Sequence, residues 1–200
     1  NPQADEIYNY QNVNGELLNY AFRNIVLLPD GSLNVLAEQY YIYEVNTTDS
    51  RGMSQVTNYY NYNDCIVYSI SAAGELNWFR KIPKKQESVN DFGQYSSVIS
   101  YQSKGSLVLF FNDNMENYDP IGTYKGTRRA FTNSLRYKDY CLAKVTVDLA
   151  TGDVQRNLFS TYDAIDAFVC LKLSAVNYQT RQVIFAASSK RDKYGFLAFE

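Results

Sequence analysis

The residues best suited to bind a cation lie in one short polar segment, 112–119, which reads Asn-Asp-Asn-Met-Glu-Asn-Tyr-Asp. Calcium prefers several carboxylate and amide oxygens as ligands. The candidate ligands are Asp113, Asn114, Asn117 and Asp119. The spacing departs from an EF-hand, because Met115 falls on a ligand position counted from Asp113 and the sixth position is not glycine. Since Asn and Asp also favour turns, the segment is either a calcium site or a turn that binds no ion.

Tyrosine and asparagine are the over-represented residue types, with 19 of each in 200 residues. Tyrosine rings stack on the apolar faces of sugars, and amides match the hydrogen-bonding pattern of hydroxyl groups. The candidate ligand-binding residues are Tyr41, Tyr43, Tyr60, Tyr62 and Trp78. The alternative is that the tyrosines fill half-exposed strand positions, the asparagines form turns, and Trp78, the only tryptophan, packs between sheets.

The sequence contains no histidine, which excludes Ser-His-Asp and Cys-His catalysis and histidine-ligated zinc within this chain. Asp163 and Asp166 could form the carboxylate pair of a glycosidase, although no other residue marks a cleft around them. The three cysteines, Cys65, Cys141 and Cys170, have spacings that fit no metal motif, and we expect them to be buried free thiols. We therefore expect no catalytic residues and no cofactor.

The net charge of −2 argues against a nucleic-acid-binding protein, so the basic runs around Lys84 and Arg128 are expected to be solvated loops rather than a polyanion site. No apolar run approaches the roughly 20 residues that span a bilayer, so we expect no membrane span. The chain starts at Asn1, and no charged segment followed by an apolar one comes after it. We expect either a removed signal peptide or a fragment of a longer protein.

An internal repeat is the strongest signal in the chain. Residues 28–36 (LPDGSLNVL) read as strand, tight turn and strand, and the same pattern returns at 101–109 (YQSKGSLVL). A second module, an apolar strand followed by a glycine turn and another strand, occupies 64–78 and recurs at 139–156. Both landmarks shift by about 75 residues, as expected for repeated units of antiparallel strands.

Each unit is predicted to hold four strands, which in the first unit cover about 23–28, 32–43, 62–71 and 75–82. The tyrosines near the ends of strands two and three predict a long twisted hairpin with aromatic cross-strand pairs and a polar tip at 46–52.

Four-stranded antiparallel repeats are typical of β-propeller blades. We therefore predict an all-β chain, 1–200, with three blade-like units over residues 23–95, 96–165 and 166–200. An N-terminal strand at 15–21 is predicted to complete the third unit. Three blades are too few for a ring, so the chain is either half of a pair related by a two-fold axis or part of a longer propeller.

Residues 64–86, with the apolar strand, the Gly-Glu-Leu-Asn-Trp segment, a basic pair and Ile-Pro-Lys-Lys-Gln, resemble a motif of uncharacterised propeller-like proteins exported by bacteria. The segment 111–117 is similar to another of their recurrent segments. The resemblance covers about residues 15–117 and departs after Asp153, where the second unit lacks the tryptophan and the Ile-Pro-Lys-x-Gln element. It implies a propeller-like fold and a periplasmic, surface or secreted location.

We therefore expect a non-catalytic binding or scaffold module outside the cytoplasm, with protein or glycan ligands. A glycan-active propeller enzyme and a purely structural segment of a larger propeller are the alternatives. The expected partners are a second copy, the rest of a longer chain, or a glycan.

Overall fold

The computed structural model describes residues 17–132, 137–177, 179, 182–189 and 194–199 of the chain, and this part consists mainly of β-strands. The first strands are β1 (Tyr20–Leu27), β2 (Leu33–Thr48), β3 (Ser54–Ile70), β4 (Leu76–Ile82), β5 (Gln86–Val89) and β6 (Ile99–Ser103). They are followed by β7 (Ser106–Asn114), β8 (Tyr140–Asp148), β9 (Val154–Thr161), β10 (Ala167–Asn177), β11 (Gln182–Ser189) and β12 (Tyr194–Phe199). The short helix α2 (Tyr162–Ile165) connects β9 to β10, and two 3-10 turns, Met115–Asn117 and Tyr137–Asp139, lie between β7 and β8. No helix in the described part of the chain is both long and apolar enough to cross a bilayer.

The strands form three antiparallel sheets that follow one another along the chain. The first sheet has the order β1-β2-β3-β4, with β5 paired to β3 beyond β4. The second sheet has the order β6-β7-β8-β9, and the third has the order β10-β11-β12. Within each sheet, neighbours in space are neighbours in sequence. The predicted all-β fold with antiparallel sheets is confirmed.

The turns form where the sequence supplies residues that tolerate a left-handed backbone. Gly74 between β3 and β4 has φ +86°, and Gly152 between β8 and β9 has φ +74°. Glycine adopts this conformation without the steric cost that a Cβ atom brings. The four strands predicted for the first unit therefore lie close to the observed β1 to β4.

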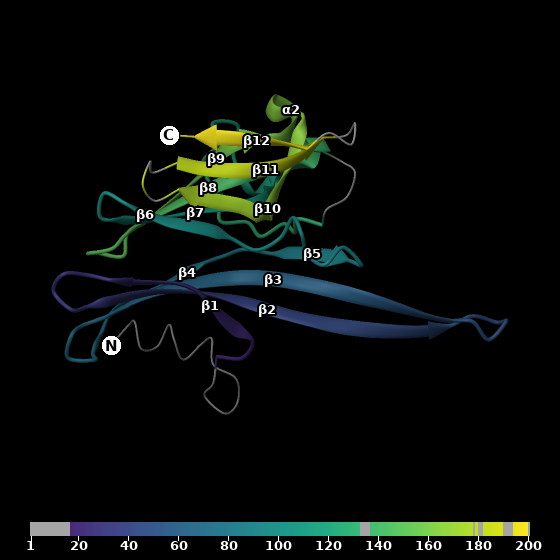
Figure 1. Cartoon of the computed structure of the whole chain (residues 1–200), viewed down its shortest axis with the longest axis horizontal. Helices are drawn as coiled ribbons and strands as arrows, with labels where there is room; N and C mark the ends of the chain where they lie inside the picture. Colours follow the sequence, from purple (N-terminus) through teal and green to yellow (C-terminus); the bar gives the residue numbers. More distant parts are fainter. Residues whose placement is uncertain (1–16, 133–136, 178, 180–181, 190–193, 200) are drawn as a thin grey trace.

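The β2–β3 hairpin continues well beyond the body of the first sheet as a two-stranded arm, which Figure 1 shows extending to one side. We define the arm as residues 40–62. Its strands pair to Thr48 and Ser54 and are joined by a turn closed by hydrogen bonds between Asp49 and Met53. Tyrosine pairs are present in part, since Tyr43 lies opposite Tyr59 and Tyr40 opposite Tyr62, whereas Tyr41 lies opposite Asn61 and Tyr60 opposite Ile42.

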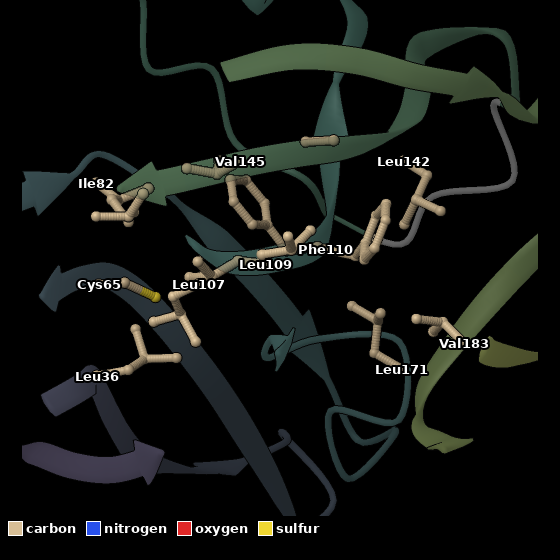
Figure 2. Packing of buried hydrophobic residues seen from close by; sticks show 14 of the residues in the cluster. Leu36, Cys65, Ile82, Leu107, Leu109, Phe110, Leu142, Val145, Leu171 and Val183 are labelled. Carbon is tan, nitrogen blue, oxygen red and sulfur yellow. The ribbon is translucent and has the colours of Figure 1, made fainter. Parts of the chain in front are cut away.

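A continuous hydrophobic core joins all three sheets, with the second sheet in the middle (Figure 2). Leu107 and Leu109 of β7 lie close to Leu36 and Cys65 of the first sheet. Phe110, on the opposite face of β7, makes an edge-to-face contact with Phe185 of the third sheet at 5.2 Å between ring centroids. Alternation of side chains along β7 therefore gives the second sheet two buried faces.

The predicted N-terminal strand differs from the observed one. Tyr20 and Ala21 belong to β1 and pair with Gln39 and Glu38, because β1 continues past a bulge near Arg23 along the edge of β2. The rest of the predicted strand up to residue 16 lies outside the described residues.

The described residues between β7 and β8 fold back over the edge shared by the first two sheets. Phe131 bridges to Gln86, Thr123 bridges to Asn157, and the Arg128 guanidinium lies 3.0 Å from Asp64 Oδ1. The segment after β7 is therefore part of the packing between the sheets.

Candidate functional site

A groove at the base of the arm combines exposed aromatic rings with polar groups. It has a volume of about 370 Å³ and is lined by residues of the arm, of β5 and of the segment before β8. The lining residues are Tyr43, Tyr59, Tyr60, Asn61, Glu87, Ser88, Val89 and Thr132. We call it the arm groove.

The aromatic wall of the arm groove is a pair of parallel rings. Tyr43 and Tyr59 lie opposite each other on neighbouring strands, with ring centroids 4.7 Å apart and planes only 3° from parallel. Tyr41 extends the row, with its centroid 6.5 Å from that of Tyr43. Tyr43 is 47% exposed. Two-residue alternation puts all three rings on one face of the arm, because Tyr41 and Tyr43 are two positions apart.

The polar wall comes from the pairing of β5 with β3. Tyr59 lies opposite Val89 and Asn61 opposite Glu87, so these side chains share one face of the small sheet. Asn61 is only 5% exposed, and its Nδ2 has no hydrogen-bond partner among the described residues. An unsatisfied buried amide is costly. This donor lies in the wall of a groove but is itself buried, so a ligand would reach it only after the neighbouring side chains shift.

The five aromatic residues selected from the sequence do not form one site. Tyr43 and Tyr60 line the arm groove, and Tyr41 continues its aromatic row. Tyr62 is 2% exposed and Trp78 4% exposed. Trp78 packs against Gly152, where a Cβ atom would come within 2.7 Å of the indole ring. Trp78 therefore fills space between the first and second sheets.

Tyr62 belongs to a buried polar cluster that the sequence did not predict. Lys84 Nζ donates to the Tyr62 carbonyl at 2.9 Å and to Gln86 Oε1 at 2.8 Å. The Tyr62 hydroxyl accepts a hydrogen bond from Lys172 Nζ at 2.5 Å, which joins the third sheet to the first. Burial, more than any other effect, raises the pKa of Tyr62 and lowers that of Lys172. The cluster therefore connects the third sheet to the first.

The basic run beside Trp78 is paired rather than free. Lys81 lies 2.9 Å from Asp64, Lys84 lies 2.7 Å from Glu38, and Lys85 lies 3.1 Å from Glu87. The side chain of Lys84 is completely buried, so the expectation of a solvated loop is wrong for this residue. Ile82, Lys84 and Gln86 occupy alternate positions and are all buried, but lysine and glutamine are polar, so residue type did not indicate this.

The segment proposed for calcium uses its oxygens within the chain. Asp113 is 1% exposed and forms a buried ion pair with Arg156. Its carboxylate also accepts hydrogen bonds from the Tyr118 hydroxyl at 2.6 Å and from Asn117 Nδ2 at 2.8 Å. Burial raises the pKa of Tyr118, and the adjacent Asp113 carboxylate adds to this effect. Asp113 therefore anchors the loop to the second sheet.

The other candidate ligands in this segment hold backbone groups in place. Asn114 Oδ1 accepts from the Glu116 amide, and Asn117 Oδ1 accepts from the Arg129 amide at 2.7 Å. Asp119 Oδ1 accepts from the amides of residues 121 and 123. Among the described residues, no group of three or more His, Cys, Asp or Glu side chains is placed to hold a metal ion. Calcium binding at this segment stays a prediction.

The remaining chemically reactive candidates are dispersed. Asp163 lies in α2 and Asp166 follows it in a left-handed conformation, and both are exposed. The three cysteines are buried and free. Burial raises the pKa of the Cys65 thiol to about 12, which disfavours the nucleophilic thiolate.

Comparison with protein-family models, with curated proteins and with solved structures finds no match to this chain. The function must therefore be inferred from the arm groove itself.

Proposed function

We propose that this protein is a non-catalytic glycan-binding module and that its arm groove is the binding site. The observation that carries the proposal is the parallel pair of Tyr43 and Tyr59 beside the buried, unpartnered amide of Asn61. Carbohydrate ligands need an apolar ring surface and hydrogen-bonding groups next to each other.

The chemistry of each wall matches one part of a sugar ring. The C–H face of a pyranose packs on the exposed ring surface of the Tyr43–Tyr59 pair. Asn61 Nδ2 donates to a ring hydroxyl, which removes the cost of leaving this amide unsatisfied. Glu87, whose side chain is 44% exposed, accepts a hydrogen bond from a second hydroxyl. Tyr41 extends the aromatic surface, which favours a chain of several sugars over a monosaccharide.

The proposed context of this site is a propeller-like stack. The repeat in the sequence and the succession of antiparallel sheets support the interpretation that each sheet is one blade. The resemblance to exported proteins supports a location outside the cytoplasm. In this arrangement the sheets form the scaffold, and the arm presents the ligand-binding face.

A glycan array followed by titration calorimetry tests the proposal with the full chain. We expect the wild-type protein to bind one class of oligosaccharide, and Tyr43→Ala and Tyr59→Ala each to weaken binding by about tenfold, or ~1.4 kcal/mol. Asn61→Leu, which keeps the size of the side chain but removes the amide, should also weaken it. Phe22→Ala is the matched control, because this aromatic residue is 69% exposed, lies on β1 and is not part of the groove.

Two results would overturn the proposal. One is an array on which the correctly folded wild-type protein binds no glycan. The other is binding that Phe22→Ala weakens as much as Tyr43→Ala does, since this would separate binding from the arm groove.

A further inference from the structure

The face of the first sheet that points away from the second sheet is apolar and partly open. It holds a groove of about 380 Å³. The lining residues are Leu17, Tyr20, Phe22, Ala37, Ile66, Tyr68, Ile70, Gly74, Leu76 and Phe79. On β1, Phe22 is 69% exposed, Ile25 58% and Leu27 68%. We call this surface the open face.

Two pairs of equivalent turns show which face of the second sheet corresponds to the open face of the first sheet. The Gly-Ser-Leu of residues 31–33 leads into β2 and that of residues 105–107 leads into β7. The glycine turns at 74–76 and 152–154 lead into β4 and β9 in the same way. Leu33 pairs with Ile70, next to Leu76 across the sheet, and Leu107 pairs with Val147, next to Val154. The two sheets can therefore be aligned residue by residue.

The alignment matches an open surface with a covered one. Two positions further from these turns, Val35 corresponds to Leu109 and Tyr68 corresponds to Val145. Val35 and Tyr68 are cross-strand partners, and so are Leu109 and Val145. Leu109 and Val145 are 0% exposed, because the first sheet packs over them (Figure 2). The open face of the first sheet is thus equivalent to the face of the second sheet that the first sheet covers.

The third sheet has one face in the core shared with the second sheet and one face that points away from it. Val183 and Phe185 of β11 belong to the core shared with the second sheet. Alternation puts Ile184 and Ala186 on the opposite face of β11. On this face Ile184 is partly exposed, whereas Ala186 and its cross-strand partner Cys170 are buried. Ile184 and Ala186 belong to neither buried hydrophobic cluster of the described residues.

We propose that the occupant of the open face is the third sheet of a second copy of this chain. Each copy carries both surfaces, and in the proposed pair the contact forms twice, which closes the pair with two-fold symmetry. The pairing continues the order in which the sheets already stack within one chain. It also buries Phe22, Ile25 and Leu27, which form an apolar patch of the kind that marks protein–protein interfaces.

Sedimentation equilibrium of the full chain tests the pairing. We expect a mass about twice the 22.9 kDa of one chain. Phe22→Glu and Leu27→Glu put a charge on the open face and should give monomers, with unchanged far-ultraviolet circular dichroism. Ile121→Glu is the matched control, because Ile121 is 88% exposed and lies in the loop between β7 and β8, away from the open face; it should remain paired.

Three results would overturn the pairing. A wild-type protein that stays monomeric over the whole concentration range contradicts it, and so does an open series of larger species. If the protein is a monomer and the amides of its open-face strands are protected from hydrogen exchange, the open face is covered by another segment of the chain, which also contradicts the pairing. The proposal is independent of the glycan site, since Leu27→Glu should keep the wild-type glycan affinity whether or not the protein pairs.

Discussion

The ammonium group of Lys84 lies 2.7 Å from Glu38 Oε1, and neither side chain is exposed to solvent. The other carboxylate oxygen of Glu38 accepts hydrogen bonds from Arg23 Nε and Ser97 Oγ, each at 2.7 Å. Gln86, which accepts from Lys84, in turn donates to the Asn112 carbonyl in the second sheet. The hydrogen bonds around this ion pair therefore connect β1, β2 and the segment after β4 with Ser97, which precedes β6, and with β7 of the second sheet.

Removing one partner of this pair should destabilise the fold strongly. Lys84→Met leaves the Glu38 carboxylate buried without its main counter-charge, so we expect the free energy of unfolding to fall by about 3–5 kcal/mol. Urea denaturation followed by circular dichroism measures the loss. Lys85→Met is the matched control, because the pair of Lys85 with Glu87 is 40% and 44% exposed and should contribute less than about 1 kcal/mol. Equal losses in the two variants would contradict a special role for the buried pair.

The same region shows what the sequence could and could not predict. Turn residues and alternation depend on neighbouring positions, so they predicted β1 to β4 approximately and a long hairpin with facing tyrosines. The pairing of Lys84 with Glu38 depends on residues that are distant in the sequence, and a run of lysines gave no sign of it.

The candidate site was predicted in part for the same reason. The sequence identified the tyrosines of the arm, but their exposure depends on β5 and on which residues fold over β3. Tyr60 is consequently 8% exposed, whereas Tyr43 is 47% exposed. The unpartnered amide of Asn61 is a property of the folded groove, so residue type alone could not reveal it.

Gly152 should tolerate alanine poorly, because two effects add. Its φ of +74° disfavours any residue with a Cβ atom, and that atom would lie 2.7 Å from the Trp78 ring. The backbone effect costs about 1–2 kcal/mol, and the overlap with the ring adds about 1–3 kcal/mol. Gly52→Ala is the control with a similar φ of +80° and no atom within 4 Å of the added Cβ. Urea denaturation followed by the fluorescence of Trp78 should show the larger loss for Gly152→Ala; the reverse order would show that the indole moves aside.

Chelation should leave the thermal stability unchanged. The oxygens of Asp113 already accept hydrogen bonds from Tyr118 and Asn117 and face the Arg156 guanidinium. A calcium ion would have to displace these partners, so adding EDTA should not shift Tm in differential scanning calorimetry. A lower Tm with EDTA that is restored by calcium, and is absent in Asp119→Asn, would establish the calcium site predicted from the sequence.

Alkaline pH should destabilise the protein partly through Cys65. Burial raises the pKa of this thiol to about 12 from its ordinary value near 9.0, so the folded state keeps a proton that the unfolded chain releases. The resulting stabilisation is complete below about pH 9 and is lost as the pH rises toward 12. Each proton difference changes the free energy of unfolding by about 1.4 kcal/mol per pH unit. Buried tyrosines such as Tyr118 act in the same direction at higher pH.

Cys65→Val isolates the thiol in this pH dependence. Urea denaturation at a series of pH values from neutral to alkaline should give a shallower loss of stability for Cys65→Val than for the wild type. Val67→Ala, which alters a buried side chain on the same face of β3 without removing a titrating group, should lower the stability at every pH and keep the wild-type slope. If Cys65→Val and the wild type lose stability in parallel, the thiol titrates alike in the folded and unfolded states, and the alkaline transition belongs to the tyrosines.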